Sequence, residues 1–206
     1  AGPAPLRETL AAGILALAGW TPDEPLYDPM CGAGTFLLEA GGRALARPAG
    51  AGRSFALEAW PCVDGALVTA VRAPSSPPPG ARASLTGGDR DPDVLASAQR
   101  NASTAGLGEA IRWLPGAFED VVPPGDPGLL VTNPPYGRRL GSPREAQAVY
   151  AALGRALRGR LSAWRAAIIV PDPACARALG GKPSATFTLT NGGLRVRLLL
   201  FAPHAR

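Results

Sequence analysis

Several residue types that perform catalysis or cross-linking in other proteins are scarce in this chain. Its 206 residues include one histidine, His204, and a single lysine, Lys182. The three cysteines, Cys31, Cys62 and Cys175, cannot pair completely and form no C-x-x-C motif. These counts argue against a disulfide scaffold and against a zinc site built from cysteine and histidine. We therefore expect no bound metal, and we expect the reducing environment of a cytoplasmic protein.

Long apolar runs are also missing. No segment approaches the roughly 18 consecutive apolar residues that cross a membrane. The stretch from Leu10 to Trp20 follows an arginine and a glutamate and ends without the small residues of a cleavage site, so it does not predict a signal peptide. Hydrophobic residues still make up 46% of the chain, enough for a packed core. At about 100–200 residues per domain, the length predicts one domain over residues 1–206.

Positive charge exceeds negative charge, with 21 lysines and arginines against 16 acidic residues, a net charge of +5. Such an excess favours a polyanionic partner, for example a nucleic acid. A general bias of the chain toward arginine, alanine, glycine and proline would also produce this net charge. Charge alone therefore leaves both explanations open.

Short apolar segments alternate with helical patterns along most of the chain. Spacings of three and four between Leu6, Leu10, Ile14 and Leu17 predict a first helix over residues 6–19. Further helices are expected at 35–40, 92–105 and 143–160. The expected strands are 25–28, 83–89, 111–114, 128–132 and 166–170, followed by a hairpin with strands at 185–190 and 194–201.

This alternation predicts a mainly parallel sheet with helices on both faces and one antiparallel strand at or near an edge. The segment from about 46 to 82 interrupts the pattern, because it is polar and rich in proline and glycine. We expect an inserted irregular segment there.

A glycine-rich turn from Asp28 to Thr35 joins the first strand to the second helix. Glycines let a ligand approach the backbone closely, and the helix N-terminus behind them presents free N–H groups. An ordinary strand–helix turn has the same composition. Asp28 makes the difference, because a carboxylate there faces a cation and repels phosphates. The turn therefore favours a ligand with an amino or sulfonium group next to a carboxylate.

Another acid ends the next strand. Ligands of open α/β sheets lie across the carboxyl ends of the strands. Asp89 is therefore predicted to accept hydrogen bonds from two ribose hydroxyls. Asp91 is predicted to cap the helix that begins at Pro92.

The most specific motif is Asn133-Pro134-Pro135-Tyr136, directly after the fourth strand. Two successive prolines hold the chain extended and donate no hydrogen bond. The Asn133 side-chain oxygen and the Pro134 carbonyl can then accept both hydrogens of an exocyclic amine. The ring of Tyr136, rather than its hydroxyl, offers a flat face on which a base can stack. A plain proline-rich turn is the alternative.

These sites, in this order, resemble the class I S-adenosylmethionine-dependent methyltransferases that modify exocyclic amines. The chain is most similar to the catalytic domains of the THUMP-associated N2-guanine RNA methyltransferases, in particular the bacterial large-subunit ribosomal RNA type. The segments that carry the resemblance are Pro5–Ala11, Asp28–Thr35, Arg53–Phe55 with Glu58–Pro61, Asn133–Gly137 with Arg139–Gly141, and Asn191–Leu194.

The resemblance implies a Rossmann-like fold with a seven-stranded, mostly parallel sheet and a C-terminal antiparallel hairpin. It implies methyl transfer from S-adenosyl-L-methionine, with S-adenosyl-L-homocysteine as product, to guanine N2 in ribosomal RNA. The implied catalytic residues are Asn133, Pro134, Pro135 and Tyr136. The implied cofactor-binding residues are Thr9, Asp28, Met30, Cys31, Gly32, Gly34, Thr35, Phe36, Asp89, Arg90, Ala117, Phe118 and Asn133.

Two positions depart from the family pattern. Gly116-Ala117-Phe118 stands where the family often has an acid facing the adenine amine, so we expect adenine to contact Phe118 and backbone groups. Arg138 stands where the ribosomal RNA enzymes commonly have an acid. We expect Arg138, Arg139 and Arg144 to bind RNA phosphates.

The expected partner is RNA, and the family usually holds it with a THUMP domain, which does not precede Pro5 here. Three alternatives stay open. The same chemistry fits adenine N6 in DNA or RNA, and it fits guanine N2 in transfer RNA. A module that binds the cofactor without turnover is the non-enzymatic alternative.

Overall fold

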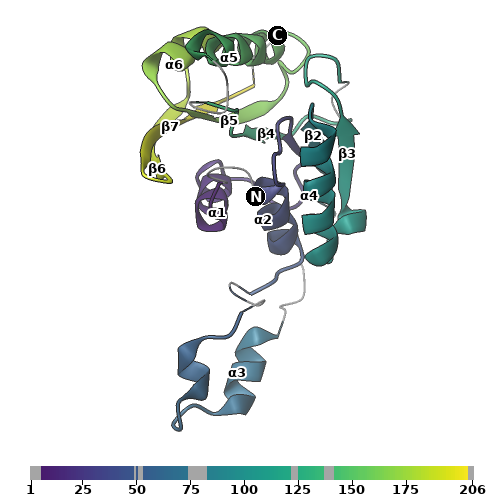
Figure 1. Ribbon diagram of the computed structural model, residues 1–206, viewed down its shortest axis with the longest axis vertical. Coiled ribbons are helices and arrows are strands. Elements are labelled where there is room, and N and C mark those ends of the chain that lie inside the picture. The colour runs from purple at the N-terminus through teal and green to yellow at the C-terminus, as the bar shows by residue number, and fades with distance from the viewer. Residues whose placement is uncertain are drawn as a thin grey trace.

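The computed structural model describes residues 6–48, 50, 53–73, 83–121, 125–136 and 142–203. Its centre is a seven-stranded sheet in the order β3-β2-β1-β4-β5-β7-β6 (Figure 1). The strands are β1 (Leu26–Asp28), β2 (Leu85–Asp89), β3 (Ile111–Pro115), β4 (Leu129–Thr132), β5 (Arg165–Val170), β6 (Ala185–Asn191) and β7 (Leu194–Phe201).

Five strands, β1 to β5, run parallel, and β7 pairs antiparallel with both β5 and β6. The predicted sheet is therefore confirmed, with its one reversed strand next to an edge. Every residue of β5 after Arg165 is buried, as expected for a strand covered on both faces.

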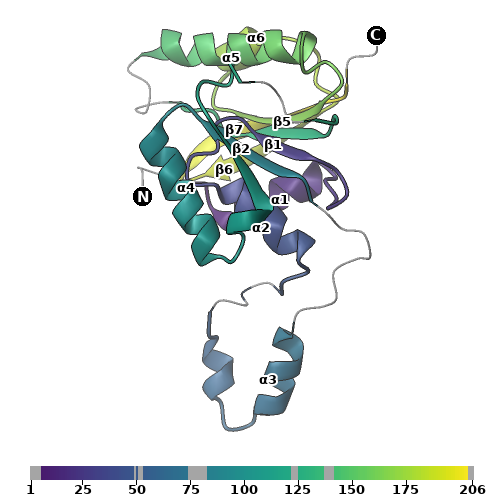
Figure 2. The ribbon, with the colours of Figure 1, turned by 90° about the vertical axis from the view of Figure 1, so that its right-hand side faces the viewer.

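Helices cover both faces of this sheet (Figures 1 and 2). One face carries α1 (Glu8–Leu17), α2 (Thr35–Ala44) and α4 (Pro92–Thr104), and the other carries α5 (Pro143–Arg158) and α6 (Pro173–Leu179). A short 3-10 helix, η2 (Gly108–Ala110), precedes β3. Among the described residues, no helix is long and apolar enough to cross a membrane.

The buried face of α1 differs from the predicted stripe. Leu15 is buried and Ile14 lies beside it in the core, whereas Leu17 is 41% exposed. The helix ends at Leu17, and Gly19 turns the chain with a φ of +63°. The three–four spacing identified the helix correctly, but packing against α2 selected a neighbouring stripe of apolar residues.

The segment predicted to be irregular contains helices, which corrects that expectation. A 3-10 helix, η1 (Ala56–Ala59), is followed by α3 (Gly65–Arg72), and both stand away from the sheet (Figure 1). The Asp64 carboxylate accepts a hydrogen bond from the Ala66 N–H and caps α3. The glycines and prolines on either side of α3 favoured the prediction of an irregular segment, although Asp64 is a good N-cap residue. That the whole chain forms one domain stays a prediction.

Close packing of α5 against α6 depends on a glycine in α5. A methyl group at Gly154 would lie 1.9 Å from the Leu179 carbonyl oxygen, an overlap that forces the helices apart. At Gly13, an exposed glycine within α1, the same methyl group would meet no heavy atom within 4 Å.

We therefore expect opposite effects from the same substitution in two helices. Gly154→Ala should lower the free energy of unfolding by about 1–3 kcal/mol, because overpacking outweighs the better helix propensity of alanine. Gly13→Ala should raise it by about 0.5–1 kcal/mol, because only the propensity changes. Urea denaturation of both variants measures the difference. A stabilised Gly154→Ala variant would contradict the packing of α5 on α6.

Candidate active site

The chain leaves β1 and β4 in opposite directions. β1 continues into α2 on one face of the sheet, whereas β4 leads toward α5 on the other face (Figure 2). Neighbouring strands that diverge in this way leave a crevice at their carboxyl ends. A cavity of about 470 Å³ occurs there, with Asp28 from the end of β1 and Asn133 from just after β4 in its wall.

The loop after β1 forms the floor of this cavity. Gly32 and Gly34 adopt positive φ values of 55° and 84°, which glycine tolerates without steric cost. Gly34 is the N-cap residue of α2 and brings no side chain to the helix end. Hydrogen bonds to other elements hold the loop in place: for example, the Cys31 N–H donates to the Gly88 carbonyl, and the Asn101 amide donates to the Ala33 carbonyl.

Asp28 is almost completely buried, with 2% of its surface exposed. Its Oδ1 accepts a hydrogen bond from the Met30 N–H at 3.2 Å. Burial raises the pKa of this carboxyl group to about 7. The nearby Thr132 hydroxyl and the Met30 N–H lower this pKa in part, while the charge of Asp89 adds to the rise. Within the described residues, the Thr132 hydroxyl has no hydrogen-bond partner of normal geometry. A bound cation would stabilise the charged form of Asp28.

Asp89 ties the two strand-end loops together. Its Oδ2 accepts from the Gly32 N–H at 3.1 Å, and its Oδ1 accepts from the Asp91 N–H at 3.1 Å. Each carboxylate oxygen keeps one further acceptor site. Asp91 in turn accepts from the N–H groups of Asp93 and Val94, so its predicted role as the cap of α4 is confirmed.

The loop after β3 closes another wall of the cavity. Phe118 is buried and lines the cavity, and its ring lies 6.0 Å from the guanidinium of Arg160. Arg160 also donates to the carbonyl groups of Phe118 and Glu119. The guanidinium therefore fixes both the backbone and the ring of this loop, at the place where the family pattern has an acid.

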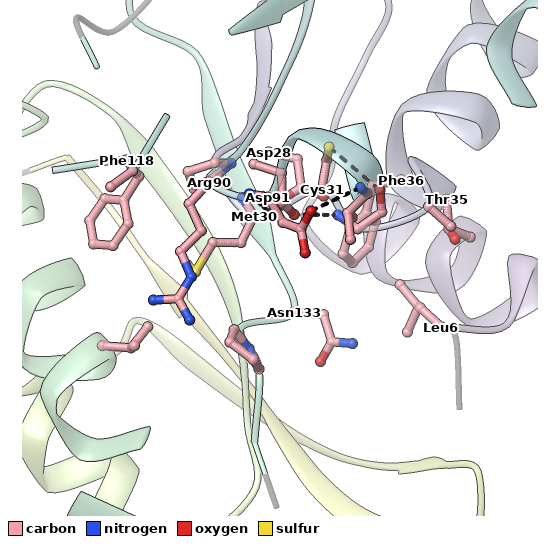
Figure 3. Close-up of a pocket in the computed structure, with 18 of the residues that line it drawn as sticks. Leu6, Asp28, Met30, Cys31, Thr35, Phe36, Arg90, Asp91, Phe118 and Asn133 are labelled. Atoms are coloured by element: carbon pink, nitrogen blue, oxygen red, sulfur yellow. Dashed lines mark hydrogen bonds between the residues drawn. The ribbon is translucent and has the colours of Figure 1, made fainter. Parts of the chain in front are cut away.

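Asn133 faces the Asp28–Cys31 loop across the cavity, with Phe118 and Leu6 near opposite ends (Figure 3). Its Oδ1 is buried and has no hydrogen-bond partner within the described part of the chain. Leaving a buried acceptor unpaired costs about 1–3 kcal/mol. The geometry thus presents an acceptor to a donor that the protein does not supply.

Most of the predicted site residues meet in this cavity. The predicted residues in its wall are Asp28, Met30, Cys31, Gly32, Thr35, Phe36, Asp89, Arg90, Ala117, Phe118, Asn133 and Pro135. Four predicted catalytic or cofactor-binding residues are not part of the wall. Thr9 is exposed on α1, Gly34 caps α2, Pro134 is buried and Tyr136 is half-buried. Arg144 is exposed on α5, and Arg138 and Arg139 fall outside the described residues.

Sequence reasoning missed several residues of the wall. Three apolar residues reach the cavity from elements around it: Leu6 just before α1, Val94 in α4 and Val149 in α5. Nothing in their local sequence distinguishes them from core residues. Glu119 and Asp120 also belong to the wall. They directly follow Phe118 in the sequence. Two acids in the loop after β3 were therefore the pattern that could have identified them as site residues.

The charge of the wall is strongly negative. Among the described residues, it contains the acids Asp28, Asp89, Asp91, Glu119 and Asp120, and Arg90 is the one cationic side chain of that part. Such a wall favours a ligand with positive charge and disfavours a dinucleotide. Burial also raises the pKa of the Cys31 thiol well above its usual range, so Cys31 stays protonated and cannot act as a thiolate nucleophile. No group of three or more metal-ligating side chains occurs among residues that the structure describes.

Comparisons with known proteins cover nearly the whole chain. A protein of Synechocystis named as an RNA methyltransferase is 39% identical over 203 residues, which are 97% of this chain and 53% of that protein. The ribosomal RNA large subunit methyltransferase K/L of Psychromonas ingrahamii is 36% identical over 93% of this chain and 27% of its own length. The chain therefore spans about half or less of these relatives.

A solved methyltransferase complexed with SAH has the same fold. It is 34% identical, with a TM-score of 0.90 over 99% of this chain and 54% of the solved chain. The family model described as the RMKL-like methyltransferase domain matches residues 1–199. The predicted class I methyltransferase fold is therefore confirmed, and the chain belongs to the family of RMKL-like methyltransferase domains.

Proposed function

We propose that this chain transfers a methyl group from S-adenosylmethionine to guanine N2 in ribosomal RNA. The observation that carries the proposal is the unpaired, buried Oδ1 of Asn133 in the wall of the cavity. Its position after β4 fits the amine-methylating motif, and the relatives named above include a large-subunit ribosomal RNA methyltransferase.

The residues of the cavity fit this cofactor. Asp28 and the acidic wall suit its sulfonium and ammonium groups, and the free N–H groups at the start of α2 suit its carboxylate. Asp89 has one free acceptor site on each oxygen for the ribose hydroxyls. Phe118, fixed by Arg160, offers an apolar surface for adenine. When bound, the cofactor would supply an electrophilic methyl group beside the target amine.

The chain itself orients the amine. The nitrogen lone pair of guanine N2 is delocalised into the ring, so the amine is a weak nucleophile. Hydrogen bonds from its two N–H groups to Asn133 Oδ1 and to the Pro134 carbonyl favour a tetrahedral nitrogen. The Asn133 oxygen is buried and unpaired among the described residues before the substrate arrives, and a prearranged acceptor of this kind stabilises the charge that develops during transfer. The remaining contribution is alignment of the amine with the methyl group. As the N–C bond forms, the S–C bond would break to release S-adenosylhomocysteine, and the amine would lose one proton to solvent.

RNA would reach the site from the side of the Tyr136 loop. The target base must leave its stack, which costs a few kcal/mol, and stacking on the Tyr136 ring offsets part of that cost. Arg144, exposed at the start of α5, can bind a phosphate nearby.

Methyl transfer with labelled cofactor tests the proposal directly. The acceptors are ribosomal RNA from cells that lack the gene, bulk transfer RNA and genomic DNA. Mass spectrometry of the nucleosides should show N2-methylguanosine in the ribosomal RNA. Methyladenine in either polymer would replace the proposed target by adenine N6. Methylated guanine in transfer RNA alone would change the RNA. No transfer to any acceptor would leave the cofactor-binding alternative.

Removal of the Asn133 amide should impair catalysis more than binding. By comparison with loss of one oxyanion-hole donor, Asn133→Ala should lower kcat by about 10²–10³-fold. Cofactor affinity should change far less, because the amide oxygen faces the target base. Asn133→Asp keeps an acceptor and should lose less activity than the alanine variant. Single-turnover methylation and calorimetry measure the two effects. Wild-type turnover by Asn133→Ala would reduce the motif to a structural turn.

The buried carboxyl group of Asp28 should make cofactor binding depend on pH. Its pKa is raised to about 7, so the group is mostly neutral at pH 6 and mostly charged at pH 8. Only the charged form attracts an ammonium group, so this part of the affinity is lost as the pH falls through 7. The ratio of wild-type to Asp28→Asn affinity should rise by up to about tenfold between pH 6 and pH 8.

Calorimetric titration of both proteins with S-adenosylhomocysteine measures this ratio. Dividing by the affinity of Asp28→Asn removes the titration of the ligand itself. A ratio that stays constant over this range would mean that Asp28 does not face the cation.

A further inference from the structure

The C-terminal hairpin extends beyond the strand that it pairs with. Val170, the last residue of β5, lies opposite Arg197 of β7, so residues 194–196 continue past the carboxyl end of β5. Gly192 and Gly193 both have positive φ, as a two-residue type I′ turn requires. The tip of the hairpin therefore lies beyond the carboxyl ends of the parallel strands, where the Asn133–Tyr136 loop begins.

At this tip, Asn191 contacts the loop. Its Nδ2 donates a hydrogen bond to the Tyr136 hydroxyl oxygen at 2.9 Å, although 55 positions separate the two residues. Asn191 is 6% exposed, and a buried amide is costly unless it is hydrogen-bonded. The Tyr136 ring is packed against the core on the α1–α2 face of the sheet. Packing therefore fixes the ring, and Asn191 fixes the hydroxyl at its far end.

We infer that Asn191 is a positioning residue that holds the Tyr136 ring ready for the target base. The inference rests on the proposed function, because it assigns the stacking surface of that site to a contact between hairpin and loop. A ring fixed at both ends loses little further freedom when a base stacks on it. The motif predicts a role for the ring alone, whereas in the structure the hydroxyl has a partner in Asn191.

The hydrogen bond between Asn191 and Tyr136 predicts that substitution of either residue weakens the capture of RNA to the same extent. Asn191→Ala removes the donor and Tyr136→Phe removes the acceptor, so each loses the same hydrogen bond. Each should raise KM for ribosomal RNA by roughly three- to tenfold, with a smaller change in kcat and no change in affinity for S-adenosylhomocysteine. The double variant should be no worse than either single variant, because the bond can be lost only once.

Steady-state methylation of ribosomal RNA from cells that lack the gene, by wild type and the three variants, measures these values. Thr190→Ala is the matched control, since Thr190 precedes Asn191 in β6 and is exposed on the hairpin. Asn191→Asp is the conservative variant. Its carboxylate can accept from the Tyr136 hydroxyl, so it should restore much of the wild-type KM. Thermal melts report whether any variant simply unfolds.

The outcomes separate the inference from the proposed function. An active wild type with an unchanged KM in Asn191→Ala overturns the positioning role and leaves the proposed function intact. Additive effects of Asn191→Ala and Tyr136→Phe overturn it too, because the residues would then act separately. Equal losses in cofactor affinity and KM would show a merely structural role. A wild type that methylates none of the RNA overturns the proposed function and the inference together.

Discussion

The divergence of the chain after β1 and β4 is the constraint on which the site depends. Because α2 and α5 lie on opposite faces of the sheet (Figure 2), a cavity opens between these two strand ends. The neighbouring region is closed: a methyl group at Gly87 would lie 2.4 Å from Leu37 and 2.9 Å from Trp113. The cavity therefore begins beyond Gly87, at the strand ends where Asp28 and Asn133 lie.

Carboxylates shape this site before any ligand arrives. Asp28 bonds to the Met30 N–H, and Asp89 bonds to the N–H groups of Gly32 and Asp91. These contacts pair N–H groups of the glycine-rich turn and of the loop after β2 that would otherwise be unpaired at the strand ends. The same acids concentrate negative charge in a wall with one arginine. Loop geometry and preference for a cationic ligand therefore arise from the same atoms, so replacement of either acid would alter both.

Sequence reasoning found the elements whose signals are local. The apolar run Ala166–Val170, the pair Asp91-Pro92 and the Asn133–Tyr136 motif each specify their structure within a few residues. Sequence reasoning failed where contacts with residues distant in the sequence determine which side chains are buried or line the cavity. Tertiary packing selected Leu15 rather than Leu17 for the core and brought Val149 to the cavity. The bond between Asn191 and Tyr136 joins residues 55 positions apart, and no spacing rule indicates such a contact.

The single histidine of this chain agrees with a site that acts on an amine by positioning it. Among the described residues of the wall there is no histidine, and the Cys31 thiol is held protonated, so the groups there that can take up a proton are carboxylates such as Asp28. What the described wall offers is a neutral amide oxygen, buried and unpaired, on a backbone that two prolines hold extended. An acceptor of this kind acts through position alone, because it neither titrates nor changes charge. The contribution of Asn133 therefore depends on how rigidly its surroundings hold the amide. The contribution of Asp28 depends instead on its pKa, because only its charged form attracts a cation.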